Sequence, residues 1–274
     1  MQRFQQIFGS KKFSIIGMVH VKALPGTPKY DGNFNGIIEQ AKHEAHIYKK
    51  HNVDGILVEN MHDVPYVQND KIGVEIIASM TRLSHEIKQI ASKIPCGIQV
   101  LASGNNQAMA IAKAANLQFI RAEGFVFAHV ADEGFTDACA GQLLRYRKQI
   151  DAGDILVFTD LKKKHSSHAI TADVSLLETV HAAEFFLTDA VILTGTATGC
   201  AVSRDDLKSI DSKCKSPILI GSGVTDGNVA DYFFKSHGAI IGSYFKQNGH
   251  WGADLCETRI TKLMDRVHEL RQSN

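Results

Sequence analysis

The chain is poor in cysteine, and its cysteines follow no recognisable pattern. Of 274 residues only five are cysteine, at positions 96, 139, 200, 214 and 256, and no two of them form a CxxC pair. A small, odd and scattered set excludes a disulfide scaffold and is typical of reduced thiols. We therefore expect a cytoplasmic protein whose cysteines are free.

Other absences exclude further classes of function. The formal net charge is only +1, which disfavours binding to nucleic acid or to a membrane surface. No apolar run approaches the roughly 18 residues that span a bilayer. No GxGxxG follows the first predicted strand, and there is no HExxH-like spacing, so a dinucleotide fold and a metal site are both disfavoured. We expect no cofactor and no metal.

The N-terminal stretch leaves one alternative open. It has no acidic residue before Asp31, and Arg3, Lys11 and Lys12 are basic, as in mitochondrial presequences. However, the first predicted strand begins at residue 13, and about a dozen residues are short for such a segment. We predict an N-terminal extension at residues 1–12 and one domain at 13–274, with the mitochondrion as the alternative compartment.

Strand-like apolar runs alternate with helix-like segments along the chain. The strand-like runs are residues 13–19, 55–59, 97–101, 118–121, 155–159, 190–193, 218–220 and 239–241. Such alternation indicates parallel strands joined by crossover helices. Eight units, in a chain slightly longer than the roughly 250 residues of a typical barrel, predict an α/β protein with a single (β/α)₈ TIM barrel.

The last two strand-like runs both end in glycine and serine. Glycine at a strand end lets backbone N–H groups approach an oxyanion, and barrels bind phosphate at the loops after strands 7 and 8. A predicted helix start at 226–228 and Lys246 would add to the site. The predicted phosphate-binding residues are Gly221, Ser222, Gly223, Gly242 and Ser243. Alternatively, these glycines only form tight turns.

Polar side chains gather where the other strands end, which is the catalytic face of a barrel. As catalytic candidates we take His20, Glu59, Asp160, Lys164 and His165. As substrate-binding candidates we take Arg121, Glu123, Thr194 and Thr198. Structural alternatives remain: a salt bridge for Asp160, internal pairing of Arg121 with Glu59 or Glu123, and a solvated lysine run at 162–164. A lysine of that run could also bind phosphate or form a Schiff base.

Several of these stretches resemble the BtpA family. The resemblance lies in Ile16-Gly17-Met18-Val19-His20, Leu24-Pro25-Gly26-Thr27-Pro28 and Leu57-Val58-Glu59-Asn60, and in residues 160–165, 194–199 and 221–225. It covers about residues 10–270 and implies a TIM barrel of the ribulose-phosphate-binding kind. The family takes its name from a cyanobacterial protein required to accumulate photosystem I, and a bacterial relative is labelled a nucleosidase.

The chain also departs from the bacterial members of that family. They typically carry Arg-Asn-Asp where this chain has Ala102-Ser103-Gly104, and Asn where it has Glu123. Lys162 replaces a histidine, whereas Lys164 and His165 remain. Residues 121–125 and 129–134 instead resemble the animal branch, in which a photosynthetic role would be out of place.

Two functions from different classes remain. The first is an enzyme that acts by acid/base chemistry on a small phosphorylated sugar or nucleoside-like metabolite, through isomerisation, lyase chemistry or N-glycosidic cleavage. The second is a non-catalytic factor that assists assembly of membrane or cofactor complexes, as the family name implies. A homo-oligomer built through the outer helices is compatible with either function.

Overall fold

The protein is a closed parallel barrel in a computed structural model that describes residues 1–195 and 197–273. The order of strands around the barrel is β1-β11-β10-β9-β7-β4-β3-β2. Their bounds are β1 Ser14–His20, β2 Gly55–Glu59, β3 Cys96–Gln99, β4 Phe119–Ala122, β7 Leu156–Leu161, β9 Ala190–Leu193, β10 Ile218–Ile220 and β11 Gly238–Ile241. The predicted (β/α)₈ barrel is confirmed, and each strand lies within one or two residues of its expected position.

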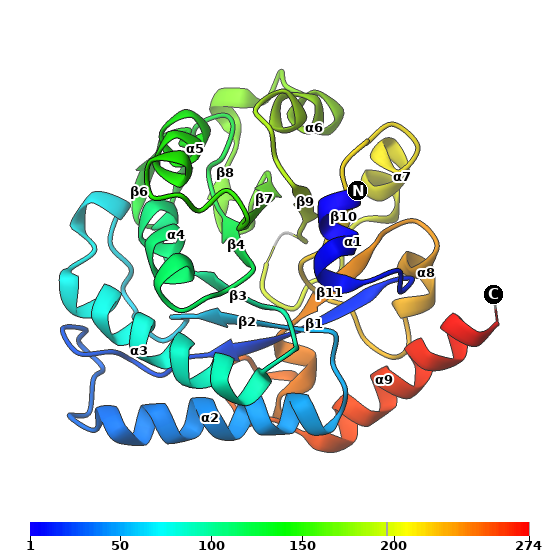
Figure 1. Ribbon diagram of the computed structural model, residues 1–274. Coiled ribbons are helices and arrows are strands. Elements are labelled where there is room, and N and C mark those ends of the chain that lie inside the picture. The colour runs from blue at the N-terminus through cyan, green and yellow to red at the C-terminus, as the bar shows by residue number, and fades with distance from the viewer. Residues whose placement is uncertain (196, 274) are drawn as a thin grey trace.

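One helix follows each barrel strand, so that the helices surround the strands (Figure 1). They are α2 Phe34–Lys50, α3 Val74–Ala91, α4 Asn105–Ala114, α5 Ala140–Gln149, α6 Leu176–Phe185, α7 Arg204–Ile210, α8 Val229–Phe233 and α9 Glu257–Gln272. The apolar stripe of α2 is buried against the barrel, with Tyr48 fully buried and its hydroxyl donating to the Met18 carbonyl. The buried faces of the helices and the outward-facing side chains of the strands together form the hydrophobic core outside the barrel.

The N-terminal residues form a helix that the sequence analysis did not predict. Helix α1 (Gln2–Phe8) lies inside the ring of the other helices (Figure 1). Its Phe4 and Phe8 are buried and belong to the inner cluster, whose barrel members are Ile16, Met18, Leu57, Phe119, Leu156, Phe158, Ala190, Ile192, Leu219 and Ile240. The Phe8 ring lies 5.8 Å from that of Phe119. Residues 1–12 therefore contribute to the barrel interior.

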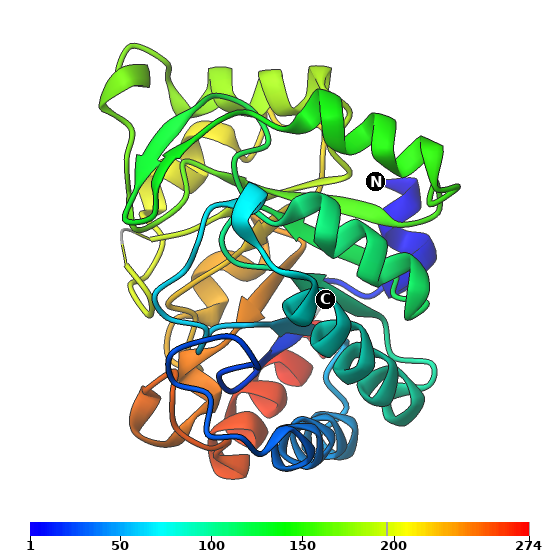
Figure 2. The same ribbon diagram turned by 90° about the vertical axis from the view of Figure 1, so that its left-hand side faces the viewer.

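A small antiparallel sheet was also not predicted. It consists of β5 (His129–Ala131), β6 (Gly134–Thr136) and β8 (Ser166–Ser167), in the order β6-β5-β8. It joins the loop after β4 to the loop after β7, and in Figure 2 it lies beside the barrel strands rather than among them. Short 3-10 turns occupy Asn69–Lys71, Ala169–Thr171, Ser243–Phe245 and Gln247–Gly249. Strands of two or three residues are too short to show a period of two in the sequence.

Candidate active site

The inward-facing positions of the barrel strands end in a ring of functional side chains and glycines. In β-strands every second residue points to the same face. Met18, Leu57, Phe119 and Phe158 belong to the inner cluster, so the residues two positions later also face inward, at the carboxyl ends of the strands. Those residues are His20, Glu59, Arg121 and Asp160, and the same spacing from Gly97, Ile192, Leu219 and Ile240 gives Gln99, Thr194, Gly221 and Gly242.

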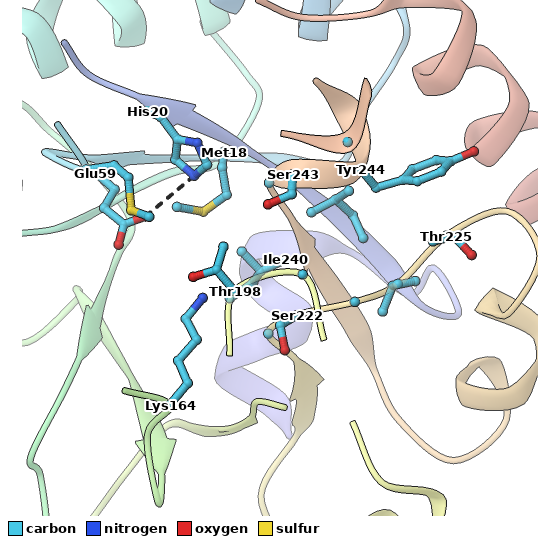
Figure 3. A pocket seen from close by; sticks show the side chains of 18 of the residues that line it. Met18, His20, Glu59, Lys164, Thr198, Ser222, Thr225, Ile240, Ser243 and Tyr244 are labelled. Carbon is cyan, nitrogen blue, oxygen red and sulfur yellow. Dashed lines mark ion pairs between the residues drawn. The ribbon is translucent and has the colours of Figure 1, made fainter. Parts of the chain in front are cut away.

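Two cavities open at this end of the barrel and share part of their walls. The first, of about 280 Å³, contains Gly221, Ser222, Gly223, Gly242 and Ser243 in its lining, and we name it the glycine-loop cavity (Figure 3). The second, of about 270 Å³, is lined by Gln99, Glu123, Asp160, Lys163 and His165, and we name it the ion-pair cavity. The residues common to both are Glu59, Met61, Arg121, Lys164 and Thr198. The predicted catalytic and phosphate-binding groups are thereby brought together.

His20 is neutral and its tautomer is fixed. Its Nδ1 lies 3.0 Å from the Trp251 carbonyl oxygen, which can only accept, so Nδ1 carries the proton and Nε2 presents a lone pair. Burial, together with the charge of Lys246, lowers the pKa of His20 to about 3. Nε2 lies 3.7 Å from Glu59 Oε2 (Figure 3). Burial raises the pKa of Glu59, although Arg121 and Lys164 oppose this, so a potential base and a potential acid stand side by side.

Lys164 extends into the glycine-loop cavity between Glu59 and the loop that carries Ser222 (Figure 3). Among the described residues, its ammonium group makes no hydrogen bond or ion pair. Burial and the neighbouring Arg121 charge lower the pKa of Lys164, against the opposing effect of nearby carboxylates. An amine whose neutral form is favoured is a better nucleophile and base than an ordinary surface lysine.

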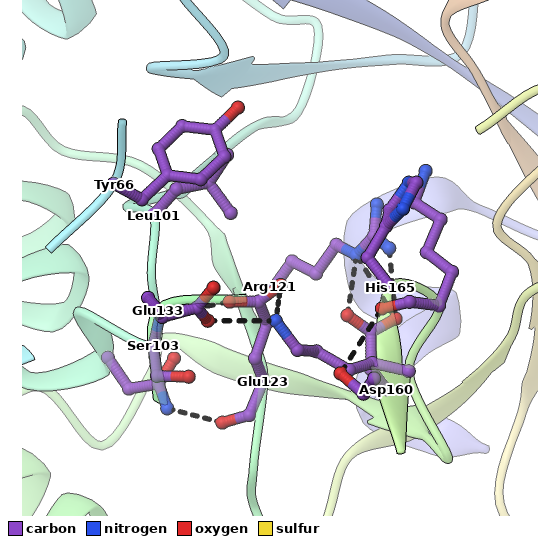
Figure 4. A network of polar contacts seen from close by, with 12 residues as sticks. Tyr66, Leu101, Ser103, Arg121, Glu123, Glu133, Asp160 and His165 are labelled. Carbon is purple, nitrogen blue, oxygen red and sulfur yellow. Dashed lines mark hydrogen bonds and ion pairs between the residues drawn. The ribbon is translucent and has the colours of Figure 1, made fainter. Parts of the chain in front are cut away.

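Arg121 and Asp160 form a buried ion pair (Figure 4). Arg121 Nε lies 3.2 and 3.1 Å from the two Asp160 carboxylate oxygens, and Nη2 lies 3.0 Å from Oδ1. Burial alone lowers the pKa of Arg121, but the Asp160 and Glu59 carboxylates together raise it. Of the alternatives left open by the sequence, the structure shows the salt bridge for Asp160, and the partner of Arg121 is neither Glu59 nor Glu123.

Glu123 belongs to a second buried set of charges. Its carboxylate lies 3.4 Å from Lys163 Nζ and accepts a 2.9 Å hydrogen bond from the Ser103 backbone N–H, while Lys163 also reaches Glu133 at 3.2 Å (Figure 4). Burial alone would raise the pKa of Glu123, but Lys163, the Ser103 N–H and Arg121 together lower it. All three side chains line the ion-pair cavity, and the only cation of the set, Lys163, is already paired with both carboxylates.

The loop after β10 approaches other backbone closely, which explains its glycines. Gly223 has φ +68°, and a Cβ there would lie 2.3 Å from the Ala201 nitrogen, so only glycine fits. Within the described part of the chain, the backbone N–H groups of Ser222, Gly223 and Val224 donate to no other residue. The Ser222 hydroxyl accepts from Gly195 N and donates to Cys200 O. Among the described residues, the unused donors of this loop are therefore backbone N–H groups, whereas that hydroxyl is already engaged.

Of two further expected contributions to the phosphate site, Lys246 is wrong and the helix start is confirmed. Lys246 does not line the cavity, because its ammonium is buried in an ion pair with Glu44. Asn228 is the N-cap of α8, as residues 226–228 predicted, but the helix it begins is short. Helix α8 has only five residues, and Asn228 closes the loop by accepting from Thr225 N and donating to Gly223 O.

Of three further predicted residues, His165 and Thr198 line a cavity and Thr194 does not. His165 lines the ion-pair cavity, and its Nε2 lies 3.0 Å from the hydroxyl of Thr198, which is in the shared wall. Thr194 lines neither cavity, and its hydroxyl is buried without a partner among the described residues. Of the 194–199 stretch used for the family resemblance, Thr196 lies outside the described residues.

The family of the chain is decided by sequence comparison. The profile of the BtpA family matches residues 11–269. The chain belongs to the BtpA family. It is 45% identical to a Caenorhabditis elegans protein described as mitochondrial, over 97% of each chain. It is also 29% identical to the photosystem I biogenesis protein BtpA of Synechocystis, over 93% of this chain and 88% of that protein.

Solved structures of low sequence identity share the same fold. KGPDC from Streptococcus mutans superposes with a TM-score of 0.61 at 7% identity, over 94% of this chain and 99% of that one. Orotidine 5′-monophosphate decarboxylase from Methanocaldococcus jannaschii gives 0.59 at 13% identity, over 94% and 99%. These similarities support the TIM barrel fold. At such low identity they carry no information about the reaction, which has to be inferred from the residues of this chain.

Sequence reasoning missed two residues that the cavities contain. Gln99 lines the ion-pair cavity and its Oε1 is buried without a partner among the described residues. A lone polar residue at an inward position of an apolar strand was the available signal. Arg259, in the first turn of α9, lines the glycine-loop cavity and donates to the Tyr244 carbonyl at 3.2 Å. No local pattern distinguishes this arginine from others on a surface helix.

The described part of the chain offers neither a metal-binding cluster nor a membrane-spanning helix. Between residues 1–195 and 197–273, no group of three or more His, Cys, Asp or Glu side chains is placed to hold a metal ion. No helix in that part of the chain has the length and apolar character needed to cross a bilayer.

Proposed function

We propose that this BtpA-family chain is an enzyme that moves a proton on a small phosphorylated metabolite. One observation carries the proposal: His20, Glu59 and Lys164, whose ammonium has no partner among the described residues, line the same cavity as the glycine loops after β10 and β11. In this proposal, the phosphate lies against the backbone N–H groups of Ser222, Gly223 and Val224. Oriented N–H groups of this kind bind oxyanions, and Arg259 would supply a nearby positive charge.

The reacting carbon would lie between His20 Nε2 and Glu59. The His20 lone pair would accept a proton from carbon or from a hydroxyl, and Glu59, when it carries a proton, would donate it to a developing oxyanion or leaving group. Isomerisation and N-glycosidic cleavage both require such a pair. The Methanocaldococcus decarboxylase, which acts on orotidine 5′-monophosphate, supports a phosphorylated substrate by analogy of fold.

A thermal-shift screen tests the phosphate site. Inorganic phosphate, ribose 5-phosphate and nucleoside monophosphates would be added to the purified chain and to a Gly242→Ala variant. A ligand at one hundred times its Kd stabilises the native state by about 2.7 kcal/mol. We expect a phosphorylated compound to raise the midpoint of the wild type and to lose that effect in the variant. Equal shifts in both proteins, or none with any phosphorylated compound, would refute the proposal.

A second candidate is an assembly factor, favoured by the name of the Synechocystis relative. Exposed apolar side chains on the small sheet support it, since Val130 and Phe135 are paired across β5 and β6 and both are exposed. The two candidates differ in a rescue experiment with Glu59→Gln in cells that lack the protein. The assembly role predicts full rescue, whereas the enzyme role predicts none. Asp160→Asn is unsuitable for this test because it removes the counter-ion of Arg121.

The compartment is a separate proposal. The description of the Caenorhabditis elegans relative supports a mitochondrial location, and the scattered free cysteines support the cytoplasm. We propose to separate the two by fractionating cells that express the full chain with a C-terminal tag. Enrichment of the tag with matrix proteins would overturn the cytoplasmic assignment.

A further inference from the structure

Two adjacent lysines at the end of β7 have opposite surroundings. Lys163 is 8% exposed, and its ammonium is neutralised by Glu123 and Glu133. Lys164 lies in the wall shared by both cavities, and among the described residues its ammonium has no hydrogen-bonding or ionic partner. A lysine that only balanced charge would be expected in a salt bridge, as Lys163 is. The difference calls for a role that needs the Lys164 amine to be free.

We propose that Lys164 is a nucleophile that forms an imine with the carbonyl group of a phosphorylated aldehyde or ketone. This rests on the proposed function, and it narrows the substrate to a sugar phosphate in its open-chain form or a similar carbonyl compound. The placement supports it: the amine extends into the cavity from the side of β7, facing the loops that would hold the phosphate (Figure 3).

Burial and one neighbouring cation shift Lys164 toward its reactive form. Burial removes water that would stabilise the ammonium, and Arg121 adds a positive charge nearby, so the pKa of Lys164 is lowered. Glu59, Asp160 and Glu123 oppose this, but Asp160 is bound to Arg121 and Glu123 to Lys163. The third carboxyl group, Glu59, forms an ion pair with neither Arg121 nor Lys163. Burial raises its pKa. The neutral amine is the form that attacks a carbonyl.

The reaction balances with groups already present. The Lys164 nitrogen bonds to the carbonyl carbon, the carbonyl oxygen takes the Glu59 proton, and the nitrogen returns one proton to Glu59. Protonation of the new hydroxyl by Glu59 then releases water and leaves a protonated imine beside a Glu59 carboxylate. The positive nitrogen withdraws electrons from the adjacent carbon, so that His20 Nε2 can remove a proton from it. No oxidant or external co-reactant is consumed.

Reductive trapping tests the proposal. The full chain would be incubated with dihydroxyacetone phosphate, glyceraldehyde 3-phosphate or ribulose 5-phosphate, treated with borohydride and mapped by peptide mass spectrometry. We expect a gain equal to the probe mass less one oxygen atom, localised to Lys164 and not to Lys163. Lys164→Arg should lose the adduct, whereas Lys162→Arg, which changes a neighbouring lysine outside both cavities, should retain it. Inorganic phosphate should compete.

The outcomes separate this proposal from the proposed function. If phosphorylated compounds stabilise the protein but no probe is trapped on Lys164, the imine is refuted and the phosphate site stands. Labelling that is spread over exposed lysines, or that is equal with the non-phosphorylated parent sugars, also refutes the imine. Absence of both stabilisation and trapping removes the two proposals together. Trapping on Lys164 that phosphate suppresses and Gly242→Ala abolishes supports both.

Discussion

The buried Arg121–Asp160 pair gives a prediction whose size follows from its geometry. Asp160→Asn keeps the shape of the side chain but removes its charge, and Arg121 is left as a guanidinium whose side chain is only 5% exposed. Removing one partner of a buried ion pair costs about 3–5 kcal/mol. The asparagine oxygen can still accept one of the three hydrogen bonds, so we expect about 3 kcal/mol, which corresponds to roughly 6–12 °C in Tm for a domain of this size.

Urea unfolding of matched variants measures this cost. Replacing both partners, as Arg121→Met with Asp160→Leu, leaves no stranded charge and should recover most of the loss. The exposed pair Arg266–Glu269, at 2.8 Å, is the surface control. Glu269→Gln should cost at most about 1 kcal/mol. If Asp160→Asn also costs less than about 1 kcal/mol, Arg121 is not confined as described, and its role in the shared cavity wall has to be revised.

Three further predictions concern the site and the barrel interior. Gly242→Ala places a methyl group about 3.0 Å from His20 Cε1 and should abolish phosphate-dependent thermal stabilisation, whereas Gly227→Ala, with no atom closer than 3.7 Å, should retain it. Phe8→Ala removes a ring that is 5% exposed and should lower the free energy of unfolding by about 3–5 kcal/mol in urea, and a loss below about 1 kcal/mol would contradict its place in the inner cluster. Because the pKa of His20 falls to about 3 on folding, the unfolded chain binds more protons below pH 6.5, and stability falls as pH drops. Lowering the pH from 6 to 5 should therefore cost wild type about 1 kcal/mol more than His20→Asn, and equal slopes would show that His20 is not buried neutral.

The barrel and most of its rim could be predicted because both depend on local pattern. Each buried parallel strand is a short apolar run, and the residue that ends it is visible in the sequence. His20, Glu59, Arg121 and Asp160 were identified in this way. Gln99 was missed because the third strand was predicted to end at Leu101. The search for functional residues therefore began after Leu101, although the strand ends at Gln99.

The partners of these side chains could not be predicted, because they depend on the register between strands. Arg121 lies opposite Phe158 in the parallel ladder of β4 and β7, which places Asp160 one inward step further along and within reach of the guanidinium. The sequence left Glu59 and Glu123 as equal alternatives. The prediction that Lys246 contributes to the phosphate site was wrong for a similar reason. The turn at Ser243–Phe245 directs this side chain away from the cavity and toward Glu44.

The contact between His20 and Gly242 links phosphate binding to the pKa of His20. In the absence of a ligand, a pKa of about 3 makes His20 a weak base. A phosphate bound in the glycine-loop cavity would bring negative charge toward His20 Nε2, because Gly242 of the same cavity lies so near that a Cβ there would be 3.1 Å from this nitrogen. An opposite charge at about 4–6 Å raises the pKa of a histidine by about one to three. Under the proposed function, phosphate binding would thus make His20 a stronger base than it is in the absence of a ligand.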